Sequence, residues 1–301
     1  MGNPGAAGQG RLAVATMEAK RAIVNALSVD VEEYFHAKVF QEGTNGARAG
    51  LESRVEASTE RVLTLLASTK ALATFFVLGQ VAAAHPSLVR KIVGEKHEIA
   101  CHGDGHELVS RQTPLEFRAD VRRAKAILED ITGEPVIGYR APNFSIGRAQ
   151  AWAYDVLLAE GFRYDSSIYP IRHDSYGDHD APRFPHDVLR SGNQRLIEFP
   201  IGTVRLLGVN LPIGGGGYFR LLPMAVTRSG IKRVNAREGQ SILFYFHPWE
   251  LDPCQPRPPM PWRHRARHYI GMEREERKLS RLFRDVRFTT IRGVLGIESP
   301  A

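Results

Sequence analysis

Cysteine is scarce in this sequence, and long hydrophobic runs are absent. The 301 residues include two cysteines, Cys101 and Cys254, which are too few for a disulfide framework or a zinc ribbon. No run of about 18 or more apolar residues is present to cross a bilayer as a helix. With 43% hydrophobic and 24% charged residues, we expect a soluble globular chain without a transmembrane segment.

A nucleic-acid-binding pattern is also missing, although basic residues are in excess. Forty Lys and Arg against 33 Asp and Glu give a formal charge of +7. The late basic clusters lie in QPRPPMPWRHRARHY and EREERKLSRLFRD, and no aromatic-interleaved basic stripe is present. We interpret them as solvated helix faces and expect no nucleic-acid partner. An anionic polysaccharide or a membrane surface stays open as a partner.

The first 21 residues have no convincing signal-peptide core. Their apolar patch, residues 12–17, is short and mild. We therefore expect residues 1–21 to be a disordered lead, with a remnant of targeting information as the alternative. The predicted location is cytoplasmic or peripheral at the inner membrane, and the periplasm stays open.

Strand-like and helix-like segments alternate through the first half of the chain. Short apolar runs predict strands at 22–35, 73–79, 98–103, 136–142 and 163–168. Helical spacing predicts helices at 57–68, 81–96, 114–133 and 148–162. From residue 195 the pattern changes to a β-rich stretch over 195–223, with a glycine loop or bend at 214–217. The remaining segments predict a helix at 224–239, a strand at 241–251 and one amphipathic helix at 273–286. Nearly apolar strands alternating with helices predict a parallel sheet covered by helices.

Polar residues follow several of these strands where each strand ends. The carboxyl ends of parallel barrel strands meet at one mouth, so these residues are expected to share a site. They are Asp30, Glu32, His102, His106, Arg140, Asp165 and His247.

The histidine pair and the carboxylate pair together suggest a metal site. His102 and His106 are four residues apart across Gly-Asp-Gly, a spacing that lets both imidazoles reach one ion. One of Asp30 and Glu32 would complete the ligands, and the other would be the general base. The alternatives are two surface histidines on a flexible turn and an acidic loop. Cys101 points away from His102 by strand alternation, as a core residue.

The remaining residues supply acid, base and oxyanion functions. Arg140 would hold the base carboxylate in place, Pro142 would stiffen the following loop, and the backbone N–H of Asn143 could support a developing oxyanion. His247 suits a general acid, and a buried Asp165 would orient its imidazole and raise its pKa. Taken alone, His247 could equally be a core histidine.

The order DxE, HxxxH, RxP, YDSS and FHPWE resembles the NodB-type polysaccharide deacetylases, carbohydrate esterase family four, over residues 22–250. It looks closest to members from exosortase (PEP-CTERM) associated exopolysaccharide loci, which carry SVDVEEYF, YRAP and FHPWELDP with a C-terminal extension. The resemblance implies an α/β fold, a distorted, TIM-barrel-like parallel (β/α) barrel of about seven strands. The barrel would span 22–250, and an extension, 251–301, would pack on it.

The resemblance also implies the chemistry. One divalent metal, usually zinc with cobalt, manganese or nickel as alternatives, would assist water attack on an N-acetyl group of an amino sugar. The substrate would be a polysaccharide or its precursor in exopolysaccharide or cell-envelope biosynthesis. His102 and His106 match the metal histidines. We assign Asp30 as base and Glu32 as ligand; the family commonly has adjacent aspartates there, so the division of roles stays open.

The resemblance extends to the other motifs. Arg140 and Pro142 match the third motif, and Asp165 and His247 match the fourth and fifth. Three further residues are expected on the substrate side of the site: Asn143, Phe144 and Trp249.

Two other functions are weighed against deacetylation. One is amidohydrolysis of a small cyclic amide, as in allantoinase-like relatives of the fold. The other is a non-catalytic polysaccharide-binding module, which the intact DxE and HxxxH motifs disfavour. The sequence leaves open whether the substrate is a polymer, a lipid-linked sugar or a nucleotide sugar, and it leaves the oligomeric state open.

Overall fold

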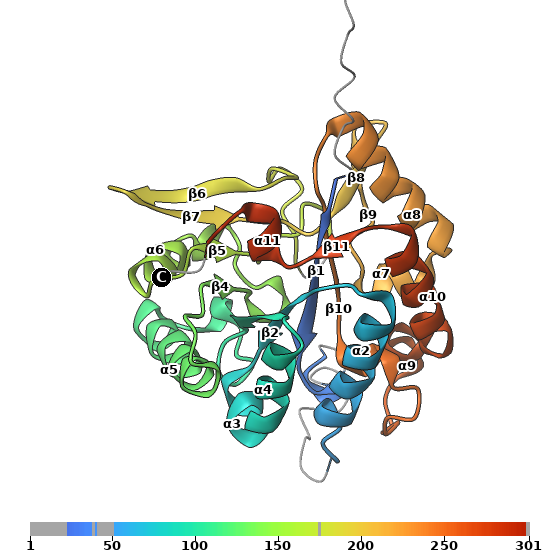
Figure 1. Ribbon diagram of the computed structural model, residues 1–301, viewed down its shortest axis with the longest axis horizontal. Helices are drawn as coiled ribbons and strands as arrows, with labels where there is room; N and C mark the ends of the chain where they lie inside the picture. Colours follow the sequence, from blue (N-terminus) through green and yellow to red (C-terminus); the bar gives the residue numbers. More distant parts are fainter. Residues whose placement is uncertain (1–22, 38–39, 41–50, 174–175, 299–301) are drawn as a thin grey trace, which may run out of the picture.

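The computed structural model describes residues 23–37, 40, 51–173 and 176–298. A large sheet lies at its centre with helices around it (Figure 1). The hydrogen-bonded strand order is β10-β1-β2-β3-β4-β5-β7-β6, and β11 also pairs with β1. These pairings are parallel except in the β6–β7 hairpin. The predicted parallel α/β architecture is confirmed. The predicted lead, residues 1–21, lies outside the described residues.

The strands of this sheet are mostly short. They are β1 (Asn25–Val31), β2 (Thr74–Val77), β3 (Glu98–Cys101), β4 (Gly138–Tyr139), β5 (Tyr164–Asp165), β6 (His186–Ser191), β7 (Gln194–Glu198), β10 (Leu243–Phe246) and β11 (Phe288–Thr289). A separate hairpin consists of β8 (Thr203–Leu206) and β9 (Val209–Pro212).

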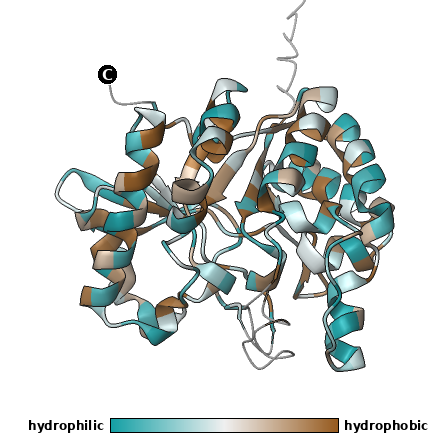
Figure 2. Cartoon of the chain, turned by 90° about the horizontal axis from the view of Figure 1, so that it is seen from below, coloured by the Kyte–Doolittle hydropathy of each residue, from teal (hydrophilic) through white to brown (hydrophobic). Residues whose placement is uncertain are grey.

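Helices connect and cover these strands. They are α2 (Val55–Thr69), α3 (Gly79–Ala84), α4 (Pro86–Gly94), α5 (Pro114–Thr132), α6 (Trp152–Ala159), α7 (Gly216–Leu221), α8 (Met224–Arg233), α9 (Trp262–Tyr269), α10 (Met272–Asp285) and α11 (Ile291–Leu295). Figure 2 shows apolar residues gathered on the strands and the inner helix sides, with hydrophilic residues outside. Among the described residues, no helix has both the length and the apolar character needed to cross a membrane.

The apolar side chains of the strands pack into two separate cores, one on each face of the sheet. Leu27 and Val29 of β1 belong to the outer core, under the helices, whereas Ala26 belongs to an inner core enclosed by the sheet. Alternation along the strand therefore turns Ser28 and Asp30 inward. Loops complete the enclosure beside β10, where Gly202 N donates to the Leu243 carbonyl at 2.9 Å and Tyr245 N donates to the Gly214 carbonyl at 2.8 Å. This irregular closure agrees with a distorted barrel.

Some local predictions were wrong. The expected helix over 81–96 is two helices, which meet at His85 and Pro86 because proline cannot continue the preceding hydrogen-bond ladder. Only part of the glycine run is a bend, since Gly216 and Gly217 begin α7. Strand β6 was not predicted, because it is partly or fully exposed along its length. The cluster that contains α9 was interpreted only as a solvated helix face, and its bounds were not predicted because it follows a proline-rich stretch.

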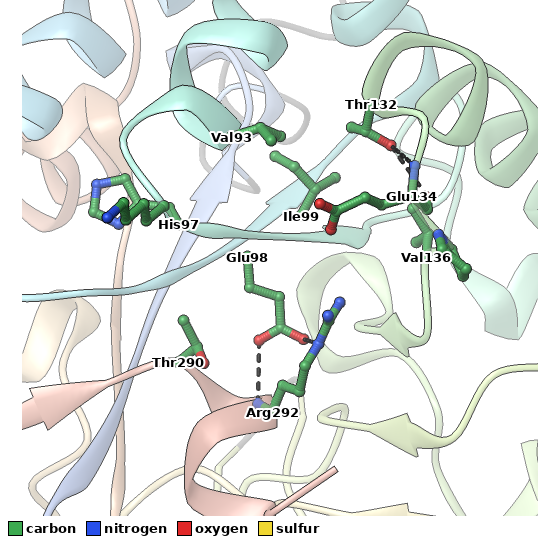
Figure 3. A pocket seen from close by; sticks show the side chains of 11 residues that line it. Val93, His97, Glu98, Ile99, Thr132, Glu134, Val136, Thr290 and Arg292 are labelled. Carbon is green, nitrogen blue, oxygen red and sulfur yellow. Dashed lines mark hydrogen bonds and ion pairs between the residues drawn. The ribbon is translucent and has the colours of Figure 1, made fainter. Parts of the chain in front are cut away.

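The amino ends of the strands are closed by the last helix (Figure 3). Buried Glu98 accepts hydrogen bonds from Thr74 Oγ1 at 2.5 Å, Tyr164 Oη at 3.0 Å and the Arg292 backbone N at 3.1 Å. A pocket of about 340 Å³ lies here, lined partly by Thr290 and Arg292. Burial raises the pKa of Glu98, and these donors oppose the rise. Residues beyond 250 thus add a strand and a helix to the barrel, and the boundary predicted at 250 stays a prediction.

Candidate active site

The opposite end of the sheet holds a cavity of about 250 Å³. Strand register explains why the predicted residues reach it. Val31 pairs with Val77, and Val77 pairs with Cys101, so Glu32 and His102 follow their strands at the same level. Five of the predicted site residues line the cavity with Glu32 and His102: Asp30, Asn143, Phe144, His247 and Trp249.

Glu32, His102 and His106 form a compact set of metal donors. One ligand atom from each lies within 4.8 Å of the others, and all three side chains are buried. His106 Nε2 lies 2.6 Å from Glu32 Oε2, and His102 Nε2 lies 3.8 Å from the same oxygen. His102 Nδ1 donates to the Arg140 carbonyl at 2.8 Å, so its Nε2 faces the carboxylate. Two imidazoles and one carboxylate are a donor set that fits zinc.

The loop after β3 bends sharply enough to bring both histidines inward. Gly103 has φ 79°, and His106 itself has φ 62°. A left-handed conformation is uncommon for a non-glycine residue and is often found at functional sites. In the described structure, His106 Nδ1 is buried without a hydrogen-bond partner.

The charge of Glu32 is stabilised by its neighbours. Burial alone would raise its pKa, but the His106 and His102 imidazoles outweigh burial and hold the pKa well below its usual range. Trp249 Nε1 also donates to Glu32 Oε1 at 3.2 Å. These neighbours favour the charged form of the carboxylate and hold it in position. Both properties suit a metal ligand.

Asp30 lies beside this set and is held by an arginine. Arg140, which is fully buried, donates from Nη1 to Asp30 Oδ1 at 2.6 Å and to Ser28 Oγ at 2.9 Å. Its other nitrogens donate to Ser166 Oγ and to the Ser166 carbonyl. The guanidinium also lies over the Phe76 ring at 4.1 Å. Arg140 thus fixes one Asp30 oxygen and leaves the other, Oδ2, facing His247.

His247 is paired with a carboxylate that the sequence analysis did not select. Glu250 Oε1 accepts from His247 Nδ1 at 2.7 Å across one turn of 3-10 helix. The opposite nitrogen, Nε2, lies 4.0 Å from Asp30 Oδ2 and 3.7 Å from Glu32 Oε1. Burial would lower the pKa of His247, but the Glu250 hydrogen bond and the nearby carboxylates raise it. Arg220 Nε in turn lies 2.8 Å from Glu250 Oε2.

Asp165 does not orient His247, so that prediction was wrong. Its Oδ1 accepts from Ser167 Oγ at 2.7 Å, and the same hydroxyl accepts from the Ala141 backbone N at 2.9 Å. Burial raises the pKa of Asp165, and the Glu198 carboxyl beside it is buried as well. Asp165 therefore supports the loop that carries Arg140. The i,i+3 spacing of His247 and Glu250 was the signal available in the sequence.

The predicted substrate-side residues have different positions. Asn143 lines the cavity with φ 51°, and its side-chain Nδ2 is buried without a hydrogen-bond partner in the described region. Phe144 lines the cavity and packs edge-on against Tyr245. Pro142 is buried in the same turn and is absent from the described cavity wall. Trp249 lines the cavity but is stacked on His247, so it supports the site from the side.

Several cavity residues lie outside the motifs used in the sequence analysis. They are His173, Tyr176, Tyr218, Arg220, Arg267 and His268. His268 belongs to α9 and stacks on Trp249 with 4.6 Å between ring centroids. Residues beyond 250 therefore help to form the cavity wall. No motif in the sequence marked Arg267 and His268, because their place in the wall depends on where α9 packs.

Comparisons with known proteins find matches over parts of this chain. The family model described as "Polysaccharide deacetylase" matches residues 42–156, and one described as "Domain of unknown function (DUF3473)" matches residues 166–296. A "Chitooligosaccharide deacetylase" of Bradyrhizobium sp. (strain ANU 289) is 32% identical over 99 residues, 33% of this chain and 43% of that protein. A "Peptidoglycan-N-acetylglucosamine deacetylase" of Bacillus cereus is 34% identical over 91 residues, 30% of this chain and 42% of that protein.

Solved structures show the same fold. A "probable Polysaccharide deacetylase" from Pseudomonas aeruginosa PAO1 superimposes with a TM-score of 0.59 at 16% identity, covering 91% of this chain and 90% of that one. At this identity the likeness concerns the fold. The match covers less than half the length of each of these two curated relatives.

Proposed function

We propose that this chain, which carries a polysaccharide deacetylase domain of the NodB type, is a metal-dependent hydrolase that removes N-acetyl groups from amino sugars. The observation that carries the proposal is the meeting of three groups on one cavity. They are the buried donor set of Glu32, His102 and His106, the Asp30–Arg140 pair and the His247–Glu250 pair.

Each group has a distinct role in the proposal. Glu32, His102 and His106 would hold one divalent metal, and we expect zinc because imidazole and carboxylate are among its preferred ligands. Such a metal polarises the substrate carbonyl and makes water a better nucleophile. Asp30 accepts the proton of the attacking water, since its Oδ2 faces the cavity while Arg140 holds Oδ1.

His247 acts on the other side of the scissile bond. Attack of water first forms the new carbon–oxygen bond and places negative charge on the former carbonyl oxygen. The carbon–nitrogen bond then breaks, and the leaving nitrogen must receive a proton to depart as an amine. The protonated His247 supplies it from Nε2, because Glu250 holds Nδ1 and favours the charged imidazolium. Asn143 lies at the wall where its backbone N–H would support the oxyanion. The products are acetate and a free amino sugar.

The expected substrate is an N-acetylated polysaccharide or its amino-sugar precursor. Two relatives are named for acting on chitooligosaccharide and on peptidoglycan N-acetylglucosamine, which share the N-acetylglucosamine unit. Tyr176 and Tyr218 give the cavity aromatic walls of the kind on which sugar rings stack. We place the reaction in exopolysaccharide or cell-envelope biosynthesis.

Acetate release tests the proposal. Purified protein with its bound metal counted would be incubated with a short N-acetylglucosamine oligomer, with and without chelator. We expect about one metal per chain and acetate release that chelator stops and zinc restores. Bound metal without acetate would contradict this substrate, and absence of both would favour the polysaccharide-binding module.

A further inference from the structure

The β8–β9 hairpin has an apolar face that extends past the core. Val204 pairs with Leu211 and Leu206 pairs with Val209, so these four side chains share one face. Val204, nearest the barrel, is 4% exposed and belongs to the outer core. The other three are 39–58% exposed. The apolar face therefore continues into solvent without a described covering element.

The tip of the hairpin adds a leucine in an unfavourable conformation. Leu207 and Gly208 connect the strands with φ 49° and 81°. Two positive φ values are typical of a type I′ turn, whose first position favours asparagine and disfavours leucine. Leu207 is nevertheless there and fully exposed, at 103% relative accessibility. A strained, solvent-facing leucine where asparagine would fold better indicates an apolar contact outside the chain.

Unpaired positive charge lies beside these leucines. Arg205 in β8 and Arg172 are both exposed, and neither has an ion-pair or hydrogen-bond partner within the described ranges. Both line a hollow of about 830 Å³ that also includes Leu211 and Tyr218. Tyr218 lines the catalytic cavity as well, so the hollow adjoins it.

Helix α9, which also borders the cavity, has a similar composition. Trp262 is 73% exposed, and Arg263 and Arg265 are exposed next to it. Arg267, farther along α9, lines the cavity and lies 3.1 Å from His173 Nε2. Tryptophan and arginine together are typical of segments that lie at a membrane–water interface.

We propose that the β8–β9 hairpin is a membrane-contacting finger, which inserts Leu206, Leu207 and Val209 into an anionic phospholipid bilayer. The apolar side chains would enter the boundary between lipid headgroups and acyl chains, while Arg205 and Arg172 would contact lipid phosphates. Surfaces that bind anionic membranes have this arrangement of apolar and basic side chains. The net charge of +7 favours the same partner. An anionic bilayer accounts both for the exposed apolar side chains and for the two arginines that have no partner among the described residues. The proposal is independent of the hydrolase chemistry.

Vesicle binding by the whole chain tests the finger. Vesicles of phosphatidylglycerol mixed into phosphatidylcholine would be compared with phosphatidylcholine alone by co-sedimentation. We expect binding that needs phosphatidylglycerol and that Leu207→Asn weakens about tenfold, the loss expected from one inserted leucine. Leu115→Asn is the matched control, because Leu115 is 79% exposed on α5, outside the hairpin. It should change binding by less than about twofold.

A stability measurement separates loss of contact from loss of fold. Leu207→Asn should melt at the wild-type temperature or above it, because asparagine suits the turn. Absence of binding to phosphatidylglycerol vesicles would overturn the proposal, as would wild-type binding by Leu207→Asn. The proposal would also be overturned if this variant bound vesicles normally but released less acetate from a soluble oligomer. That result would show that the hairpin contacts the substrate.

Discussion

Strand β3 has a buried histidine before it and another after it, at opposite ends of the barrel. His97, at the amino end, accepts a hydrogen bond from the Ala73 backbone N at 3.3 Å, and burial lowers its pKa to about 4. His102, at the carboxyl end, donates through Nδ1 and turns Nε2 toward Glu32 and the cavity. Residue type and burial are alike at the two positions, so the difference lies in what surrounds each ring.

The buried glutamates at the two ends repeat the contrast. Glu98 is surrounded by neutral hydroxyls, a backbone amide and Arg292, which satisfy its oxygens from within the fold. Glu32 instead faces imidazoles around an open cavity, and His106 Nδ1 nearby has no described partner. A satisfied buried network stabilises a fold, whereas incompletely satisfied donors are typical of a ligand site. The amino end is therefore interpreted as structural and the carboxyl end as functional.

The largest expected effect is loss of the metal site. His102→Ala removes a proposed ligand, and loss of an outer partner alone costs about 10–100-fold. We therefore expect at least about a hundredfold loss of acetate release and little bound metal in elemental analysis. His97→Asn is the matched control at the other end of β3, and it should retain the metal. Equal metal loss in both variants would contradict the interpretation that only the carboxyl end of β3 holds the metal site.

Glu250→Gln should reduce turnover without removing the metal. Glutamine keeps the size of Glu250 but lacks the charge that favours protonated His247, and general acid catalysis contributes about a hundredfold or more. We expect kcat to fall at least about tenfold while KM and metal content change little. Asp165→Asn should not lower kcat selectively in this way, since Asp165 contacts Ser167 and not His247.

Glu98→Ala should reduce stability and leave the chemistry intact. The substitution leaves Tyr164 Oη and Thr74 Oγ1 without their acceptor, and an unsatisfied buried polar group costs about 1–3 kcal/mol. We expect the free energy of unfolding in urea to fall by about 2–3 kcal/mol, with unchanged activity per folded molecule. Lost metal binding in the folded variant would show that the ends are not independent.

His97 should make stability depend on acid pH. Its pKa falls from 6.5 to about 4 on folding because burial disfavours the charged imidazolium. The unfolded chain therefore binds the extra proton as pH drops below about 6.5, and stability is lost from there down to about pH 4. The lost contribution is at most about 3 kcal/mol. Urea unfolding of His97→Asn should lack this component, and an identical pH profile would contradict the lowered pKa.

The ends of the strands could be predicted from the sequence because the strands are short apolar runs that are directly followed by polar residues. Asp30, Glu32, His102, His106 and His247 do meet at one end of the sheet. Their spacing along separate strands, with parallel pairing in register, was enough to place them together.

Side-chain pairing was harder to predict than residue position. Asp165 and Glu250 are both buried carboxylates near strand ends, and only packing decides that Glu250 reaches His247. The contribution of His268 depends on α9, whose proline-rich approach and even spread of arginines show no apolar periodicity. Both misses concern contacts set by tertiary packing, which residue spacing does not encode.

Metal content of the two carboxylate variants tests the central assignment most directly. Asp30→Asn and Glu32→Gln would be purified in parallel, and bound metal and acetate release would be measured on the same samples. We predict that Asp30→Asn retains about one metal per chain without turnover, while Glu32→Gln loses the metal. Metal loss in Asp30→Asn with retention in Glu32→Gln would contradict the account and exchange the two roles.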